Sequence, residues 1–506
     1  MNSISAAARA TIRDFRTQEL ANTAWSFAKC KVPAQPLLDA ISAAAIARRH
    51  EFRTQELANT SWAVAILGVS HPEQPLMPAI AAAAIARLSS FTATDLANTS
   101  WAFEALPLRH QPLMHAIAAA SLAKRSDFNA QDLSNTAWSF ASSNFRDSPL
   151  LQAIASQSIK LITDFCPPEL ASTSWSFAAL PLPDEPLLAA ISSESIRKIS
   201  DFNPQSIANS AWALATLDVR DQPLLDALAS ASLARISEFN VQALSNTAWA
   251  FSRMECLHEP LFAAIAAAAI RTITAFDAQA LSNTLWSFAR LELWHQPLLE
   301  SIAASSIATS SELTTQEIAN MSWALAKIWG HHMPLLHALA SQAIANITLL
   351  NRQELSITAW AFSTLALRPQ PLLHAIAAQA IPNISDFTML EISNTAWAFA
   401  QLAERNSTLM EAIAASAIAP GTDGGLVADT PEILTPNGIY SIAWSSWRAM
   451  RPDLGMWLFR QDPHTSSKEP LVCGVLIMDA EWLRCRPSER GLQDLLQGRG
   501  RSPSVP

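Results

Sequence analysis

The chain has 506 residues, of which 50% are hydrophobic and 15% charged, and its formal net charge is −9. Nucleic-acid-binding domains are usually basic, so this balance argues mildly against a nucleic-acid partner but permits a local basic stripe. The five cysteines show no disulfide framework or metal-ligand spacing, and no run of 18 residues is purely apolar, which indicates a reducing compartment and no membrane-spanning helix.

The chain begins inside a repeat unit. Ile4 stands 11 residues before Phe15, the distance that also separates Ile41 from Phe52, so "MNSISAAARATIRDF" is the second half of a helix. Either something else caps a ragged edge, or the chain starts downstream of its true beginning. We favour the second, because terminal solenoid units normally need a polar outer face. The sequence shows no Arg- and Ser-rich presequence, and any targeting segment would have been lost with the missing beginning.

One phrase, typified by "QDLSNTAWSF" at residues 131–140, recurs with small changes from the copy around Trp25 to the copy around Trp397. The interval between its tryptophans is 37 residues in nine cases and 39 in one, where "ILGVSHPEQ" carries a two-residue insertion typical of a loop. A fixed period of this length predicts an α-solenoid, in which each unit packs only against its neighbours. The tryptophans are Trp25, Trp62, Trp101, Trp138, Trp175, Trp212, Trp249, Trp286, Trp323, Trp360 and Trp397.

The first helix of each unit, helix A, has strong start signals. In "FNPQSIANSAW", Phe202 precedes the cap Asn203, Pro204 is the first helical residue, and Ile207 can pack back onto the Phe. The predicted caps are Thr92, Asn129, Asn203, Asn240, Asp277, Thr314, Asn351 and Thr388. The acids that would complete capping boxes are Asp95, Asp132, Glu317, Glu354 and Glu391.

The second helix, helix B, begins near a Pro-Leu-Leu phrase, often behind Asp147, Asp184 or Asp221, and is rich in Ala, Leu and Ile on nearly all sides. Each helix has roughly 13 residues, or about 20 Å. No alternating strand pattern occurs in residues 1–418. We therefore predict an all-α fold, an α-solenoid of about eleven 37-residue two-helix repeats in a single elongated domain over residues 1–418.

Residues 419–506 break the regularity. They contain nine of the 11 glycines, "GIYSIAWSSWRAM" as a possible degenerate repeat, and a tail that is predicted to be disordered. No function is assigned to this region.

The polar face of helix A carries the candidate ligand contacts. We number the positions of helix A from the Phe that precedes it. Leu at position 5, Ala or Ser at position 9 and Phe at position 12 form the predicted core stripe. Gln at position 3, Asn at position 7 and a variable residue at position 14 lie on the opposite face, and the Trp lies at the margin of that face. A constant amide row beside a variable row is the pattern expected of a modular reader. The RNA-binding candidates are Asn22, Asn59, Asn98, Asn135, Asn209, Asn246, Asn283, Asn320, Asn394, Gln131, Gln205, Gln242, Gln279, Lys29, Arg253, Arg290 and Lys327.

A structural role is equally open for the asparagines, because a half-buried amide can bond the loop backbone of the next unit. For the tryptophans we favour packing between repeats over a stacking platform.

A column of cations stands near the end of helix B. These residues could follow phosphates, or they could complement the helix dipole. The phosphate-stripe candidates are Arg48, Arg87, Lys124, Lys160, Lys198, Arg235 and Arg271.

No catalytic constellation or phosphate-binding loop occurs, so the sequence predicts neither an enzyme nor a cofactor. A zinc site at His331 and His332 is disfavoured, because the pair stands by itself in a loop. We therefore expect no metal.

The unit with "QxLxNxxWAFAxL" followed by a Pro-Leu-Leu helix resembles the octotricopeptide (OPR) repeats and the related repeats of RAP-domain and FAST-kinase-like organellar proteins. The resemblance covers nearly all of residues 1–418. It implies single-stranded RNA binding in a mitochondrion or chloroplast, in processing, stability, editing or translation of transcripts; without an organelle the location would be cytoplasmic. The alternative is a protein-protein interaction scaffold that binds an extended peptide along its concave face, which the acidic charge supports. Protein partners fit either reading, whereas neither a membrane nor a small-molecule substrate is expected.

Overall fold

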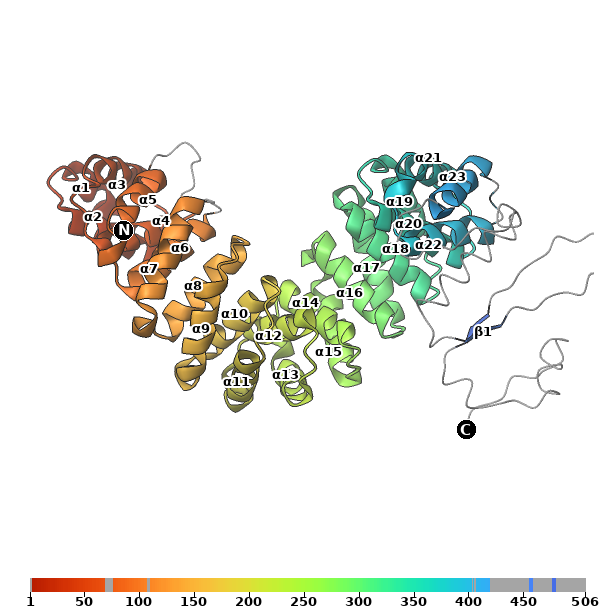
Figure 1. The fold of residues 1–506 in the computed structure, drawn as a ribbon, viewed down its shortest axis with the longest axis horizontal. Helices are drawn as coiled ribbons and strands as arrows, with labels where there is room; N and C mark the ends of the chain where they lie inside the picture. The colour runs from red at the N-terminus through yellow and green to blue at the C-terminus, as the bar shows by residue number, and fades with distance from the viewer. Residues whose placement is uncertain are drawn as a thin grey trace, which may run out of the picture. The chain divides into compact units, whose positions relative to one another are not determined.

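The computed structural model describes residues 2–68, 76–106, 110–402, 404, 406–418, 455–457 and 476–478. They belong to two compact units, unit 1 (Met1–Leu313) and unit 2 (Thr314–Pro506). Within each unit, helices A and B alternate along the chain (Figure 1). The insertion after Gly68 and the possible degenerate repeat lie outside the described residues.

Unit 1 starts with α1 (Asn2–Ala10), which is the predicted incomplete helix B. Its A helices are α2 (Thr17–Lys29), α4 (Thr54–Ile66), α6 (Ala93–Ala105), α8 (Ala130–Ser142), α10 (Pro167–Ala179), α12 (Pro204–Leu217), α14 (Val241–Arg253) and α16 (Ala278–Arg290). Its B helices are α3 (Gln35–Ala47), α5 (Leu76–Ile85), α7 (Gln111–Ala123), α9 (Ser148–Lys160), α11 (Glu185–Arg197), α13 (Gln222–Arg235), α15 (Glu259–Thr272) and α17 (Gln296–Ala308).

A short 3₁₀ turn joins most B helices to the next helix A, and we call this connection the B–A junction. In unit 1 these turns are η1 (Leu88–Ser90), η2 (Arg125–Asp127), η3 (Ile162–Asp164), η4 (Ile199–Asp201), η5 (Ile236–Glu238), η6 (Ile273–Ala275) and η7 (Ser310–Glu312).

Unit 2 continues the same pattern. Its A helices are α18 (Thr315–Lys327), α20 (Arg352–Thr364) and α22 (Met389–Gln401), and its B helices are α19 (Met333–Ala345), α21 (Gln370–Ala380) and α23 (Ser407–Ile418), with η8 (Ile381–Asp386) before α22. Two three-residue strands, β1 (Gly455–Trp457) and β2 (Leu476–Met478), pair antiparallel with Met456 opposite Ile477. The predicted array end at residue 418 coincides with the end of α23, and apart from these strands the predicted region 419–506 lies outside the described residues.

The core lies between consecutive A helices. In both units, the most extensive contacts are those between the A helices of consecutive repeats in the same unit, whereas consecutive B helices contact one another less. The predicted stripe is buried: in α8, for example, Leu133, Ala137 and Phe140 are at most 1% exposed. The all-α solenoid of paired helices is therefore confirmed.

The predicted helix starts are also confirmed. All eight proposed cap side chains accept a hydrogen bond from the backbone amide three residues on, and all five predicted capping boxes form. Asp147, Asp184 and Asp221 cap helix B in the same manner. Such caps satisfy amides that would otherwise lack partners at the helix start.

Four histidines take the same capping role, which the sequence did not reveal. The Nδ1 atoms of His110, His258, His295 and His332 accept hydrogen bonds of 3.1–3.2 Å from the amides of the leucines three residues later. His332, weighed above as half of a zinc pair, is thus a helix cap.

Helix A ends in a turn that normally favours glycine. The residue after the C-cap is left-handed in most repeats, with φ of 52° at Asn144, 54° at Glu255 and 56° at Glu292. The following amide reaches back to the Phe carbonyl of helix A, as from Phe145 to Phe140 at 2.9 Å. This is the Schellman arrangement, and only Gly68 supplies it with glycine at a described position.

No helix in the described part of the chain combines the length and hydropathy needed to cross a membrane.

Candidate nucleic-acid interface

The asparagines at position 7 of helix A remain accessible. We call Asn22, Asn59, Asn98, Asn135, Asn209, Asn246, Asn283, Asn320 and Asn394 the amide row. Asn22 is exposed and the other eight are half-buried. The residues around them on the same helix are sealed, since Thr136 and Ala137 beside Asn135 are 0% exposed. Nine of the eleven A helices thus bring one amide to their surface, and Ser172 in α10 and Ile357 in α20 are the exceptions.

The amide row makes no side-chain hydrogen bond within the described part of the chain. Among side-chain hydrogen bonds of the described residues, Asn22, Asn135 and Asn283 take part only through their backbone carbonyls, which accept from the serine hydroxyls four residues later. The inter-repeat bond that would explain these amides as architecture is therefore not formed among the described residues. Every amide keeps two donor hydrogens and an acceptor oxygen for a ligand.

Gln131, Gln205, Gln242 and Gln279 lie one turn earlier and are all exposed. They stand in the first turn of helix A, where the backbone amides have no hydrogen-bond partner within the helix. They extend the polar face from the amide row toward the B–A junction.

The tryptophans form a partly continuous ladder along the amide row. Trp25 is 40% exposed. The centroids of Trp25 and Trp62 are 6.4 Å apart, and those of Trp175 and Trp212 are 6.0 Å apart. Trp212 also stacks on Trp249, with 6.4 Å between centroids and 27° between planes. The interpretation of the tryptophans as packing between repeats is confirmed for these pairs.

Cations at position 14 rest on this ladder. Lys29 Nζ lies 5.4 Å from the centroids of both Trp25 and Trp62, and the guanidinium groups of Arg253 and Arg290 lie 5.6 Å from the rings of Trp249 and Trp286. Arg253 Nε also donates to the Ala215 carbonyl at 3.0 Å, and Arg290 pairs with Glu255 at 3.0 Å. Lys327, in unit 2, is half-buried. Because these charges already have partners, the variable row offers a ligand less free charge than its sequence suggests.

Five of the seven cations of the predicted phosphate stripe bind the main chain of the preceding repeat. Lys198 Nζ donates to the carbonyls of Thr163 and Phe165, both at 2.7 Å, and Arg235 Nη1 donates to the Phe202 carbonyl at 2.6 Å. Arg48, Arg87 and Lys124 bond Phe15, Phe52 and Phe91 in the same way. The sequence separation is 33 residues, or 35 across the insertion. A phosphate at these five positions would compete with hydrogen bonds that join repeats.

Lys160 and Arg271 do not form this link. Each stands 32 residues after its Phe instead of 33, and each side chain is exposed without a partner in the described part of the chain. A shift of one residue turns the side chain by about 100° around the helix, which removes it from the carbonyl.

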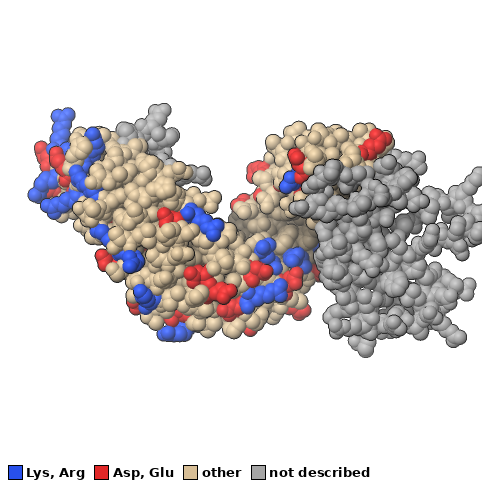
Figure 2. Space-filling model, in the orientation of Figure 1, with Lys and Arg blue, Asp and Glu red and all other residues tan. Residues whose placement is uncertain are grey.

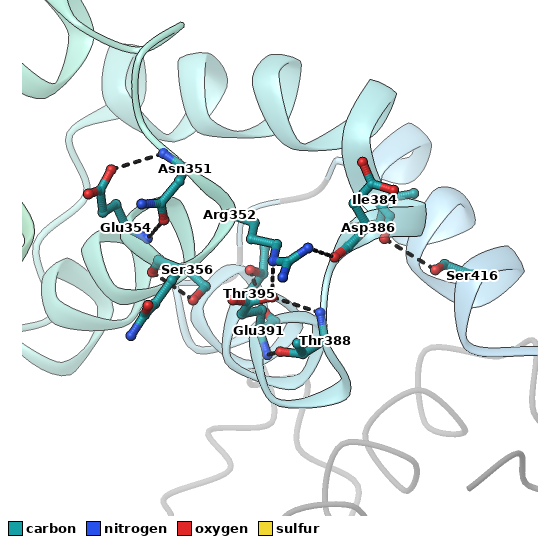
Figure 3. A network of polar contacts seen from close by, with 11 residues as sticks. Asn351, Arg352, Glu354, Ser356, Ile384, Asp386, Thr388, Glu391, Thr395 and Ser416 are labelled. Carbon is teal, nitrogen blue, oxygen red and sulfur yellow. Dashed lines mark hydrogen bonds and ion pairs between the residues drawn. The ribbon is translucent and has the colours of Figure 1, made fainter. Parts of the chain in front are cut away.

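Unit 2 has no cation at the described positions of the column, and an arginine there bonds the following repeat instead of the preceding one. Where Asn346 and Asn383 stand in the cation column, Arg352 at the start of α20 donates to the Asp386 carbonyl of the next junction and pairs with Glu391 at 3.4 Å (Figure 3). Asn346 and Asn383 instead bond carbonyls of their own helices. Arg352, Asn383 and Glu391 line an open cleft of about 510 Å³. The link therefore persists although the residue that supplies it changes.

The capping acids differ in their electrostatics. Burial raises the pKa of Asp132, although the Asn129 amide and the Thr94 hydroxyl, 3.2 Å away on the preceding repeat, oppose the shift. The pKa of Glu19 is lowered by the backbone amide and then by the side chain of Arg16. The pKa values of two acids at the same repeat position are thus shifted in opposite directions, because Asp132 is buried and Glu19 is not.

Charge is unevenly spread over the face in Figure 2. Lys and Arg gather at the end of unit 1 where α1–α3 lie, and acidic and basic side chains intermix along the edge that carries α9, α11 and α13. Most of the intervening surface is uncharged. A ligand on that surface would be held mainly by hydrogen bonds and apolar contact.

Three comparisons with known proteins bear on identity. Curated proteins give no match. Among solved structures, the chain is similar to one described as "Homology model of the full-length AP-3 complex in an intermediate open conformation", at 10% identity and a TM-score of 0.31, over 88% of this chain and 87% of that one. A TM-score below 0.5 supports no conclusion about role.

A family model described as "RESC6: RNA-editing substrate-binding complex 6 protein" matches residues 3–185 and 154–333, well over half of the chain. This confirms the predicted place in organellar RNA metabolism and the helical repeats. It does not single out the octotricopeptide, RAP-domain or FAST-kinase-like families that the repeat phrase resembles. The chain belongs to the family of RNA-editing substrate-binding complex 6 proteins, and it is a helical-repeat protein of RNA editing.

Proposed function

We propose that the chain binds single-stranded RNA along the exposed face of helix A, as a non-catalytic subunit of a multiprotein complex that recognises editing substrates in a mitochondrion. The amide row carries the proposal: nine asparagines recur at one helical position, none is buried, and none of their side chains is bonded within the described residues. Family membership supports RNA as the ligand.

Asparagine suits this ligand chemically. Its amide can donate and accept at the same time, as base edges and ribose hydroxyls require. Packed helices lie about 8–10 Å apart, which matches the reach of one extended nucleotide, so one repeat for each base is geometrically reasonable. Residues at position 14 would then adjust base preference from repeat to repeat.

The Trp ladder limits how bases can stack. Where neighbouring rings are already 6.0–6.4 Å apart, a base cannot enter between them without separating the repeats. We therefore propose that bases lie against the amide row and the outer ring edges, instead of between rungs.

An extended peptide is the second candidate for the same face. The net charge of −9 favours it, because phosphate attraction supplies much of the affinity of ordinary nucleic-acid-binding proteins. Amides can bond a peptide backbone as well as they bond bases.

The test compares Asn135→Ala with Asn246→Ala, and their combination, against the unchanged protein in binding to single-stranded RNA. Each lost amide should cost about 0.5–1.5 kcal/mol, so the double variant should bind about 5- to 150-fold more weakly with an unchanged melting temperature. A lower melting temperature with unchanged affinity would contradict the proposal. A protein partner recovered after ribonuclease treatment, and lost in the double variant, would favour the peptide reading.

A further inference from the structure

The first 53 residues are basic in an acidic protein. They hold eight Lys and Arg against four Asp and Glu, whereas the whole chain has a net charge of −9. Six of the eight are arginines at two successive B–A junctions. We set aside Arg48, which belongs to the cation column, and call the other five the basic pole: Arg9, Arg13, Arg16, Arg49 and Arg53. None of the five belongs to the cation column that links repeats.

These arginines lie close together because the two junctions are neighbours. Arg9 is in the last turn of α1, and Arg13 and Arg16 lie between α1 and α2. Arg49 and Arg53 stand at the equivalent place between α3 and α4. The junctions are joined by Arg48, which donates to the carbonyl of Phe15, next to Arg16. Figure 2 shows the resulting gathering of basic side chains at this end of unit 1.

Most of the basic pole is exposed and has charge that no acid in the described part of the chain neutralises. Arg9, Arg13 and Arg53 are exposed, and within the described residues their side chains have no hydrogen bond or ion pair. Arg16 is 84% exposed although it pairs with Glu19. Arg49 is half-buried and donates one hydrogen bond to the Ile46 carbonyl. Later junctions have fewer unpaired cations, because Arg197 pairs with Glu194 at 3.0 Å, and Lys160 and Arg271 each stand as a single exposed cation.

We propose that the basic pole binds backbone phosphates of the RNA, so that this part of unit 1 supplies the electrostatic attraction that the amide row lacks. The inference rests on the proposed function. All five residues are arginines, whose planar fork matches phosphate oxygens in a bidentate way.

The experiment measures binding of a fluorescein-labelled oligouridylate to the full chain between 50 and 300 mM salt. The test variant carries Arg9→Gln, Arg13→Gln and Arg53→Gln. Each lost phosphate contact lowers the salt slope by about 0.7, so the variant should lose about 2 from the slope and bind about 100-fold more weakly at 100 mM salt. The melting temperature should hold, because none of the three side chains has a partner to lose.

The matched control carries Arg125→Gln, Arg146→Gln and Arg220→Gln, the same loss of charge at other exposed positions of unit 1 that have no ion pair among the described residues. Its slope should equal that of the unchanged protein, and an equal fall in both variants would overturn the basic pole. Wild-type RNA binding with an unaltered slope in the test variant would also overturn it, and would leave the proposed function standing. No RNA binding by any form would refute the proposed function itself. Loss of binding to phosphatidylserine vesicles with RNA binding intact would make the pole a membrane contact instead.

Discussion

The B–A junctions and the exposed face of helix A each repeat one chemical group in register, yet the two groups differ in what they bond. At the junctions, the cation of one repeat donates hydrogen bonds to carbonyls of the repeat before it, as Lys198 does to Thr163 and Phe165. On helix A, the amide row keeps its hydrogen-bonding atoms unused within the described residues. Repetition by itself thus identifies neither architecture nor a ligand site, and the bonding partners distinguish the two.

The asparagines provide the same contrast within one helix. Asn203 caps α12 by accepting from Ser206 N at 2.8 Å, whereas Asn209, six residues later, has no side-chain bond among the described residues. The residue type is identical, and only its place in the helix differs. Matched pairs of this kind allow stability and ligand binding to be separated experimentally.

The largest effect is expected from the junction cations. Arg235→Met keeps most of the stem but leaves the Phe202 carbonyl without its charged donor, which should lower stability by about 1.5–3 kcal/mol and leave RNA affinity unchanged. Arg271→Met, in the same column without a partner, should change stability by less than about 0.5 kcal/mol. Equal losses in the two variants, measured by thermal unfolding, would show that the link between repeats does not matter.

The register explanation can be tested in the same background. Arg271→Thr combined with Thr272→Arg moves the cation to 33 residues after Phe239 without altering composition. The double variant should unfold at a higher temperature than the unchanged protein. No gain would show that position alone does not create the bond.

Replacing Asn203 and replacing Asn209 should change the free energy of unfolding by different amounts, and this difference should be smaller than that between the two junction cations. Asn203→Ala removes a cap and should cost about 0.5–2 kcal/mol with RNA affinity retained. Asn209→Ala should leave stability within about 0.5 kcal/mol and weaken RNA binding. Unfolding curves and RNA titrations on both variants decide the matter, and a stability loss at Asn209 as large as at Asn203 would remove the distinction.

Lys29 tests whether position 14 belongs to the architecture. Its ammonium lies between Trp25 and Trp62, so Lys29→Met should cost about 0.5–1 kcal/mol. Ser142→Met, at the same position in α8 and exposed, is the control and should have no comparable effect. Urea unfolding measures both variants, and an unchanged midpoint for Lys29→Met would mean that the ring contacts do not contribute.

The smallest effects concern pH. The pKa of Asp132 is raised in the folded chain, so its ionisation is disfavoured, and stability relative to Asp132→Asn should fall as pH rises above the ordinary value of 3.8. The pKa of Glu19 is lowered, so its stabilising contribution relative to Glu19→Gln should be present above the ordinary value of 4.5 and disappear as pH falls below it. Parallel pH profiles for the two variants, obtained by thermal unfolding, would contradict the assigned difference in burial.

Local sequence was sufficient for much of the fold. Caps such as Asn203 act on an amide three residues away, and the core stripe of Leu133, Ala137 and Phe140 follows from the turn of one helix, so both could be predicted from short windows. The amide row was located in the same way, as one helical position that carries asparagine in nine of the eleven A helices.

Contacts between repeats could not be predicted in this way. The bond from Arg235 to Phe202 spans 33 residues, and only the packed structure shows that the carbonyl faces the guanidinium. The histidine caps were missed because histidine is not among the favoured cap residues, and the left-handed turn at Glu255 was missed because it lacks glycine. The division into two units leaves no mark in the period of the tryptophans.

The most direct measurement locates the RNA on the array. Single-stranded RNA that contains 4-thiouridine is crosslinked to the full chain, and the attached peptides are identified by mass spectrometry. We predict crosslinks in peptides of several A helices, around Asn135 in α8, Asn209 in α12 and Asn246 in α14. Crosslinks confined to the B helices, with the A helices unlabelled, would contradict a role for the amide row in holding the strand.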